Sequence, residues 1–304
     1  MTRRPQRQID AGEAVDAGDR FSVIVPAHNE EAVIARCLRS IYADAPIGSE
    51  PEVIVAANGC SDQTVARARD AAPNAIILEL EPPSKVLAIN EANLVANHFP
   101  RLVMDADVEA SFASLSATAD VLRSGGVMAA SPQMELNLAD CSAAVRSYYK
   151  VWQSLPYASD GLIGGGVYGL SRKGMDRVAP LPNVIGDDLY VRTRFARTER
   201  ANIAQDDAGN EVRVIMTPPA SIGQLIGIEA RRRMGKHEVD CNHPSEQSGT
   251  INRWQDLLGS LSRGANVFDL SIFVAIKLIA FGRYKLSLSQ GQRDWTRDNS
   301  SRRA

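Results

Sequence analysis

Strand-like and helix-like segments alternate regularly over the first 107 residues, and this alternation limits the possible folds more than any other feature of the sequence. The strand-like segments are short, apolar and rich in β-branched residues. They cover residues 21–27, 51–58, 75–80 and 102–105. Apolar residues at helical spacing lie between them, over residues 30–42, 61–72 and 85–98. Strands joined by helical crossovers run parallel, so the sequence predicts an α/β fold with a mostly parallel sheet flanked by helices.

The pattern is less regular after residue 107. We expect further strands at 126–136, 161–171 and 211–218, and helices at 143–155 and 187–195. After about residue 220 the chain is helical and basic. We therefore expect a disordered lead-in over 1–20, one α/β domain over 21–230 with halves 21–110 and 111–230, and a helical, basic C-terminal region over 231–304.

Composition and charge exclude several classes of protein. The net charge of −2 over 304 residues argues against nucleic acid as the main partner, because duplex binding requires a basic face. The four cysteines are scattered, which suits a reducing compartment better than a zinc site. Residues 1–20 contain arginines without an apolar run, so they predict neither a signal peptide nor a membrane anchor. The most apolar segment, 269–281, is too short to span a bilayer and contains Lys277.

The stretch RLVMDADVEA places Asp105 and Asp107 directly after an apolar strand. Neighbouring carboxylates repel each other, and a divalent cation would relieve that repulsion. Ligands of parallel sheets bind beyond the carboxyl ends of the strands, which is where this pair falls. The alternative is a solvated turn or a helix N-cap, with Val108-Glu109-Ala110 opening a helix.

Four motifs that follow one another in the sequence, VIVPAHNEE, VIVAANGCSDQT, SKVLAINEAN and MDAD, resemble those of the family 2 glycosyltransferases, which are nucleotide-sugar enzymes of the GT-A fold. The resemblance covers residues 21 to about 236. It implies a nucleotide-binding half over 21–110 and an acceptor half over 111–230. It also implies that Asp105 addresses the ribose and Asp107 holds a divalent cation, Mg²⁺ or Mn²⁺. The donor-binding residues that it implies are Pro26, His28, Glu30, Asn58, Asp62, Lys85 and Asp105.

Several of these positions have a plainer alternative. The family carries adjacent carboxylates where this chain has Ala57 and Asn58, which leaves the identity of the base open. His28 could be a histidine that is simply hydrogen-bonded within a turn. Lys85 could be a solvated lysine at the start of a helix.

A second acid pair, Asp187-Asp188, begins the short helix of PNVIGDDLYVRTRF. An acceptor hydroxyl needs a general base, and in the family the Asp of a Glu-Asp pair at the matching place is that base. The resemblance therefore implies that Asp188 is the base and that Asp187 supports it. The alternative is that the two acids cap the helix, where they complement its dipole.

Two further segments extend the resemblance. GGGVYG formally satisfies a dinucleotide-binding pattern, but the glycines lie inside a strand-like segment and VYGLSRKG is not expected to start a helix. The family places its acceptor pocket here, and the residues implied are Gly165, Gly166 and Trp152. In ARRRMGKH, the resemblance implies that Arg231 and Arg233 bind the diphosphate, whereas a solvated helix face is the alternative. His237 would add to the metal site or lie on the surface.

The resemblance implies an inverting, metal-dependent transfer of one sugar from a nucleoside-diphosphate sugar to a hydroxyl of a lipid-linked or saccharide acceptor, in the synthesis of cell-surface glycans or glycolipids. The Gln-x-x-Arg-Trp motif of processive members is absent around Arg233. The alternatives are a nucleotidyltransferase, although VPAHNEEA lacks its glycine-rich basic loop, and a catalytically inactive binding module.

We expect a cytoplasmic protein with a peripheral contact to the inner membrane face. The apolar face of 270–281 and the basic tail that follows would form that contact. The alternative is that this helix packs on its own domain.

Overall fold

The computed structural model describes residues 20–155, 158, 164–248 and 254–289. Most of the expected lead-in, residues 1–19, and the tail beyond Ser289 lie outside the described residues.

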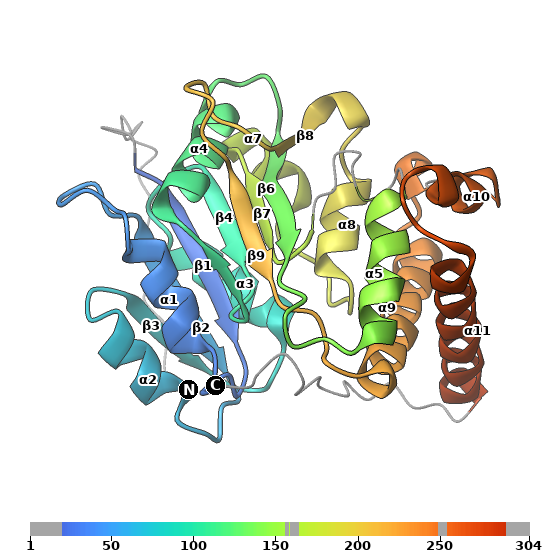
Figure 1. The fold of residues 1–304 in the computed structure, drawn as a ribbon. Coiled ribbons are helices and arrows are strands. Elements are labelled where there is room, and N and C mark those ends of the chain that lie inside the picture. Colours follow the sequence, from blue (N-terminus) through green and yellow to red (C-terminus); the bar gives the residue numbers. More distant parts are fainter. Residues whose placement is uncertain (1–19, 156–157, 159–163, 249–253, 290–304) are drawn as a thin grey trace.

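The first half of the chain forms the predicted parallel sheet (Figure 1). Helices α1, α2 and α3 connect its four strands. The apolar side chains of the strands alternate between the two faces: Val23 and Val25 pack with α1 and α2, whereas Ile24 packs with α3. The strands are β1 (Ser22–Ala27), β2 (Glu52–Asn58), β3 (Ile76–Leu80) and β4 (Arg101–Met104), in the order β3-β2-β1-β4. The helices are α1 (Ile34–Tyr42), α2 (Thr64–Ala71) and α3 (Lys85–Val95).

The second half extends the sheet beyond β4 with strands of mixed direction. Strand β7 (Val167–Leu170) runs antiparallel between β4 and β6 (Ala129–Leu136). The first part of β6 pairs with β8 (Arg200–Ile203), and its second part pairs with β9 (Arg213–Met216). Strand β5 (Val108–Ala110) completes the edge beside β9. Over the described residues the order is β3-β2-β1-β4-β7-β6-β9-β5, with β8 beside β6, so the prediction of a mostly parallel sheet flanked by helices is confirmed.

Some local details differ from the sequence-based expectations. Val108–Ala110 is a strand, so the alternative in which these residues open a helix is not observed; α4 (Phe112–Arg123) starts after its N-cap residue Ser111. Of the strand expected at 161–171, residues 161–163 lie outside the described residues; within 164–171 the strand covers Val167–Leu170, because Gly164, Gly165 and Gly166 turn with positive φ.

The segment VYGLSRKG does start a helix, contrary to our expectation. Ser171 accepts the backbone N–H of Gly174 and caps α7 (Arg172–Val178). The glycines still do not form a dinucleotide-binding loop, since Gly164–Gly166 precede the strand β7 instead of linking a strand to a helix.

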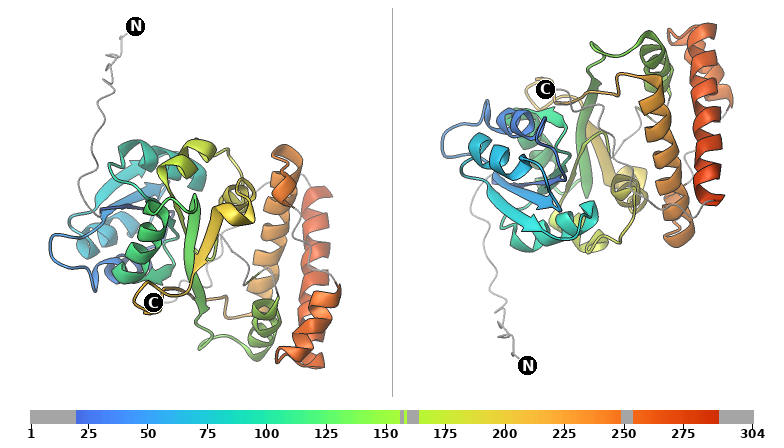
Figure 2. Two further views of the ribbon diagram at one scale, coloured as in Figure 1. Left: turned by 90° about the horizontal axis from the view of Figure 1, so that it is seen from above. Right: turned by 90° about the horizontal axis from the view of Figure 1, so that it is seen from below.

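The C-terminal helices share a core with α5 (Ala143–Ser154), at the end of the molecule away from β3 (Figures 1 and 2). Two long helices, α9 (Ile222–Asn242) and α11 (Val267–Ser289), lie side by side and both pack on α5. Helix α9 runs without a break across the domain boundary expected at residue 230. The remaining elements are α8 (Asp187–Thr193), α10 (Trp254–Ser262) and the short 3₁₀ helices Arg197–Glu199 and Glu246–Ser248.

Candidate active site at the carboxyl ends of the parallel strands

The predicted strand-end residues meet at one edge of the sheet. His28 directly follows β1, Asn58 is the last residue of β2, and Asp105 directly follows β4. Because β1, β2 and β4 are parallel neighbours, their carboxyl ends lie together. This edge is where the parallel fold offers a ligand site.

Lys85 joins two acidic residues that lie far apart in the sequence. Its Nζ lies 2.7 Å from Asp105 Oδ1 and 3.0 Å from Asp187 Oδ1. Burial opposes the charged amine, but the carboxylates of Asp105 and Asp187 together hold the pKa of Lys85 well above its ordinary value. Lys85 is therefore a fixed cation at the start of α3. Its two ion pairs connect the end of β4 to the start of α8.

Asp187 and Asp188 differ in environment. Asp187 is buried, and burial raises the pKa of its carboxyl although the nearby Lys85 opposes the rise. Tyr168 donates a long hydrogen bond of 3.4 Å to Asp187 Oδ2. Asp188 is exposed, and its Oδ1 accepts the backbone N–H of Leu189 at 2.7 Å. A carboxylate that accepts a backbone N–H in the first turn of a helix is what the helix-capping alternative predicts.

The glycine turn before β7 borders both acidic groups. The backbone N–H of Asp105 donates to the carbonyl oxygen of Gly166 at 2.7 Å. Gly164 has φ +124°, and a Cβ built on it would lie 2.8 Å from Asp188 Oδ2. The carboxylate of Asp188 therefore sits directly over a backbone without side chains. The same direction at Gly165 is filled by Met134 and at Gly166 by Val108, so the turn packs closely on side chains of the protein itself.

Asp105 and Asp107 are both half-buried at the end of β4, so their carboxylates can be approached. Their negative charge also affects a neighbouring residue. Burial raises the pKa of the Cys37 thiol, and the carboxylates of Asp107, Asp105 and Glu109 raise it further. Over the described residues, no group of three His, Cys, Asp or Glu side chains could hold a metal ion by itself. A magnesium-type site needs fewer protein ligands, because one or two carboxylates combine with substrate phosphates and water. The pair fits that chemistry.

The first motif forms a network of hydrogen bonds around the ends of β1 and β2. His28 Nδ1 lies 2.6 Å from the carbonyl oxygen of Asn58, which agrees with a histidine hydrogen-bonded within a turn. Asp62 Oδ1 accepts the backbone N–H of Thr64 at 3.0 Å and so begins α2. Glu30 and Pro26 are buried in the same region. These residues shape the edge of the site.

Asn58 is almost fully buried, with 1% of its surface exposed. Its amide nitrogen donates to the carbonyl oxygen of Ala27 at 3.0 Å, whereas its Oδ1 has no hydrogen-bond partner among the described residues. The Oδ1 atom of Asn58 can therefore still accept a hydrogen bond, although it lies below the surface.

The three consecutive arginines of α9 have three different surroundings. Arg232 pairs with the buried Glu229 at 2.9 Å, and the guanidinium of Arg233 lies over the ring of Phe281. Arg231 lies one helical turn before Gly235, on the same face of α9. Gly235 touches Gly186, since a Cβ on Gly235 would lie 3.1 Å from the Gly186 nitrogen. Residue 231 is therefore on the side of α9 that packs at the Gly186 turn.

The described contacts of Trp152 and His237, like that of Arg233, lie elsewhere. Trp152 is 4% exposed and packs in the core of α5, α9 and α11 against Tyr149. His237 is exposed, and its Nδ1 lies 3.6 Å from the Cys241 sulfur. Its ring also contacts Tyr284.

The structure adds residues that the sequence did not single out. Tyr168 and Glu238 carried no recognisable signal, and Glu238 accepts the backbone N–H of Ile185 just before the acid pair. Asn90, five residues after Lys85 in SKVLAINEAN, exchanges two hydrogen bonds of 2.9 Å with the backbone of Leu181.

Residues 22–158 match the family model described as Glycosyl transferase family 2. No curated protein matches the sequence significantly. Among solved structures, the chain is similar to the mannosyltransferase PcManGT from Pyrobaculum calidifontis in complex with GDP-Man and Mn²⁺. That similarity has 21% identity and a TM-score of 0.57, and it covers 90% of this chain and 79% of that one.

The chain is also similar to glucosyl-3-phosphoglycerate synthase from Mycobacterium tuberculosis in complex with Mn²⁺, UDP and glucosyl-3-phosphoglycerate. Here the identity is 17% and the TM-score 0.50, with 81% of this chain and 88% of that chain covered. At these identities the two structures establish the fold, and the family match covers the half that carries the strand-end motifs. Residues 22–158 are therefore similar to the family 2 glycosyl transferases, and the chain has the GT-A type of fold.

Proposed function

We propose that this protein is an inverting, metal-dependent glycosyltransferase that moves one sugar from a nucleoside-diphosphate sugar to a hydroxyl acceptor. The observation that carries the proposal is the placement of Lys85 between Asp105 and Asp187, at distances of 2.7 and 3.0 Å. It joins the expected donor side, at the end of β4, to Asp187 at the start of α8, next to the expected base Asp188. Buried ion pairs contribute little net stability on average, so three charged groups gathered here favour a role in ligand binding.

On the donor side, the cations Lys85 and Arg231 would receive the diphosphate, and Asp105 would address the ribose. Asp107 would hold the divalent cation together with Asp105, since both carboxylates can be approached at the strand end. When bound, such a cation would neutralise charge on the leaving diphosphate. The complexes of the two similar structures with Mn²⁺ and with GDP-Man or UDP support a donor and an ion of this type.

On the acceptor side, Asp188 would take the proton of the attacking hydroxyl. It is exposed, whereas Asp187 is buried and engaged by Lys85 and Tyr168. Asp187 would therefore hold the turn in place while Asp188 acts as the base. Gly164 lets the Asp188 carboxylate lie directly against the backbone of the turn, which sets the place of the proposed base. A single displacement with one base inverts the configuration of the sugar.

The proposal extends to a lipid-linked or saccharide acceptor used in cell-surface glycan or glycolipid synthesis. The absence of a Gln-x-x-Arg-Trp motif around Arg233 supports one transfer per encounter rather than a processive polymerase.

To test this function, the protein is incubated with Mn²⁺ and a panel of radiolabelled nucleotide sugars, and the slow hydrolysis of each sugar donor is measured. We expect one donor to be hydrolysed, and we expect Asp188→Asn to reduce turnover by about 10²–10⁴ while donor affinity stays near that of the wild type. Donor binding without turnover in the wild type would favour an inactive binding module. Release of pyrophosphate from a nucleoside triphosphate and a sugar phosphate would favour a nucleotidyltransferase. A melting temperature measured for both proteins shows whether a loss of activity reflects unfolding.

We further propose that α11 makes a peripheral contact with an anionic lipid surface. Within the described residues no helix is long and apolar enough to cross a bilayer. Part of the segment 270–281 is core, because Phe273, Ile276 and Ala280 are buried against α5 and α9. The opposite side of α11 carries exposed apolar side chains, followed by the exposed cations Arg283 and Lys285. These apolar residues are Val267, Phe268, Leu278, Ile279 and Leu286.

Flotation with anionic and neutral liposomes at low and high salt tests this contact. We expect binding to anionic liposomes that weakens with salt, since each basic residue near the surface contributes about 1 kcal/mol. The double variant Leu278→Gln, Ile279→Gln should not float. Leu94→Gln, which changes an exposed leucine of α3, is the matched control. A wild-type protein that remains unbound with both liposomes would refute the membrane contact.

A further inference from the structure

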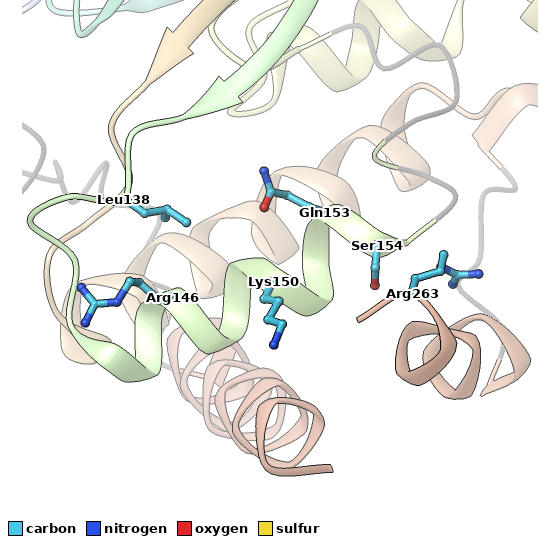
Figure 3. A pocket seen from close by; sticks show the side chains of 6 residues that line it. All are labelled: Leu138, Arg146, Lys150, Gln153, Ser154 and Arg263. Carbon is cyan, nitrogen blue, oxygen red and sulfur yellow. The ribbon is translucent and has the colours of Figure 1, made fainter. Parts of the chain in front are cut away.

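A hollow lies along α5, and it shares no residue with the site around Lys85 (Figure 3). Its volume is about 490 Å³. Figure 3 shows Arg146, Lys150 and Ser154 following one another along α5, with Arg263 beyond Ser154. The residues that line it are Leu138, Arg146, Lys150, Gln153, Ser154 and Arg263. We call this hollow the α5 groove.

The α5 groove is basic. Arg146 and Lys150 are four residues apart, so they share one face of the helix, and Arg263 comes from the turn that follows α10. No acidic residue is among the six lining residues. The groove therefore brings three cations from two parts of the chain to one depression in the surface.

Two of these cations have no acidic partner. Arg146 Nη1 donates to the carbonyl oxygen of Cys141 at 2.5 Å, and Arg263 Nη2 donates to that of Asp256 at 3.0 Å. Among the described residues neither guanidinium contacts a carboxylate. Each arginine is thus held in place by a backbone carbonyl while its charge and its remaining N–H groups stay available.

Lys150 is different, because it forms an ion pair of 3.1 Å with Asp269. Asp269 is buried and also accepts the backbone N–H of Asn266 at the start of α11. This pair fixes the middle of the groove against α11. The exposed Gln153 adds an uncharged amide donor, whereas the Ser154 hydroxyl already donates to the carbonyl oxygen of Val151 at 2.6 Å.

We propose that the α5 groove is a binding site for a phosphate group, separate from the donor site. Guanidinium groups bind phosphate through paired N–H donors, and two of them without acidic partners at the ends of one groove match an anion with several charged oxygens. If these cations only formed a solvated helix face, we would expect neither a hollow beside them nor a third cation from another element. The phosphate can belong to a soluble ester or to a lipid headgroup, since both offer the same charged oxygens.

Calorimetry with tripolyphosphate and co-sedimentation with vesicles of phosphatidylglycerol or phosphatidylcholine test the site. The test variant is Arg146→Gln, Arg263→Gln. The control is Arg39→Gln, Lys173→Gln, which removes the same charge from two exposed positions on α1 and α7. Melting temperatures for both variants establish that they fold.

We expect the test variant to bind tripolyphosphate or phosphatidylglycerol vesicles at least about tenfold more weakly than the wild type, and the control variant to bind as the wild type does. Weakened binding of tripolyphosphate alone assigns the groove to a soluble phosphate ester. Weakened binding of phosphatidylglycerol vesicles assigns it to a lipid headgroup. Any binding of tripolyphosphate at the donor site remains in both variants, so it does not affect the comparison. Equal affinity of the test and control variants for both probes would overturn the proposal.

Discussion

Asp187 and Asp188 are adjacent in the sequence but face different surroundings. Asp187 is 3% exposed, whereas Asp188 is exposed to solvent. A buried carboxylate costs free energy unless a cation or hydrogen-bond donors meet it, and Lys85 and Tyr168 do so here. One acid thus anchors the turn and leaves the other accessible. At the scale of single residues, this difference in burial supports the proposed division of roles, with Asp187 in support and Asp188 as the base.

We predict that Asp107→Asn abolishes Mn²⁺-dependent nucleotide binding and leaves the fold intact. The change removes a charged oxygen ligand while nearly preserving the shape of the side chain. Calorimetry with and without Mn²⁺ measures the effect, and Asp70→Asn on the exposed end of α2 makes the same change of charge away from the site. Unchanged metal-dependent binding in Asp107→Asn would mean that the Asp-x-Asp pair does not hold the ion.

We predict that Gly164→Ala reduces kcat by at least about tenfold. A Cβ at residue 164 would lie 2.8 Å from Asp188 Oδ2, so the carboxylate must move away from the place that the turn gives it. Gly209→Ala is the control, because Gly209 has φ +84° but nothing within 4 Å. Both variants carry backbone strain, and only the first should lose activity. Equal kcat values for the two would show that the position of Asp188 does not matter.

At the scale of elements, two helices hold the turn before α8. From α9, Glu238 accepts the backbone N–H of Ile185 at 2.8 Å, and Gly235 packs against Gly186. From α3, which also supplies Lys85, Asn90 exchanges hydrogen bonds with the backbone of Leu181. The acid pair is therefore positioned by contacts from both halves of the chain.

We predict that Asn90→Ala lowers the free energy of unfolding by about 1–3 kcal/mol, because two backbone groups of Leu181 lose their partner. It should also lower kcat by up to about 10²-fold through displacement of the acid pair. Asn202→Ala on β8 is the matched control, since Asn202 likewise makes two hydrogen bonds, to Ser131 and Pro132. Denaturant unfolding and steady-state kinetics give both quantities. If both variants lost stability equally and neither lost kcat, Asn90 would be a purely structural residue.

At the scale of the whole molecule, the two long C-terminal helices, α9 and α11, are joined to each other by a buried ion pair as well as by apolar packing. Glu229 of α9 is 2% exposed and contacts Arg232 and Lys277, the latter from α11. Burial opposes the charged carboxylate, but Arg232 and Lys277 outweigh it and lower the pKa of Glu229 to about 2. The lysine inside the apolar segment thus has its partner within the protein.

We predict that this ion pair makes stability depend on acid pH. A carboxyl with a lowered pKa contributes its full stabilisation above its unfolded pKa of 4.5, and loses it as the pH falls towards about 2. The loss amounts to about 3 kcal/mol. Glu229→Gln should flatten the pH dependence of the unfolding free energy in this range. Asp240→Asn, which breaks an exposed ion pair with Lys236 on the same helix, should leave it nearly unchanged. A wild-type-like pH profile in Glu229→Gln would contradict the prediction.

Sequence reasoning worked best for regular elements and least well for short ones. The alternation of apolar strands and amphipathic helices up to Asp107 predicted β1–β4 and α1–α3, because each buries a periodic set of side chains. Helices α4 and α7 and strand β8 were missed. Serine caps mark the starts of α4 and α7, but a cap by itself is a weak signal. The short strand β5 was not predicted, because three residues show no period that would distinguish a strand from the start of a helix.

The sequence by itself determined the fold class and placed the acidic motifs at strand and helix ends, because local periodicity and turn chemistry depend on neighbouring residues. Only the tertiary structure decided which of these motifs meet. Lys85, Asp105 and Asp187 come together although 102 positions of the numbering separate the first from the last, and Gly164 makes room for Asp188. Likewise, Trp152 became a core residue and Arg146 and Arg263 came to line one groove. Such contacts depend on how whole elements pack, and the spacing of residues along the chain does not contain that information.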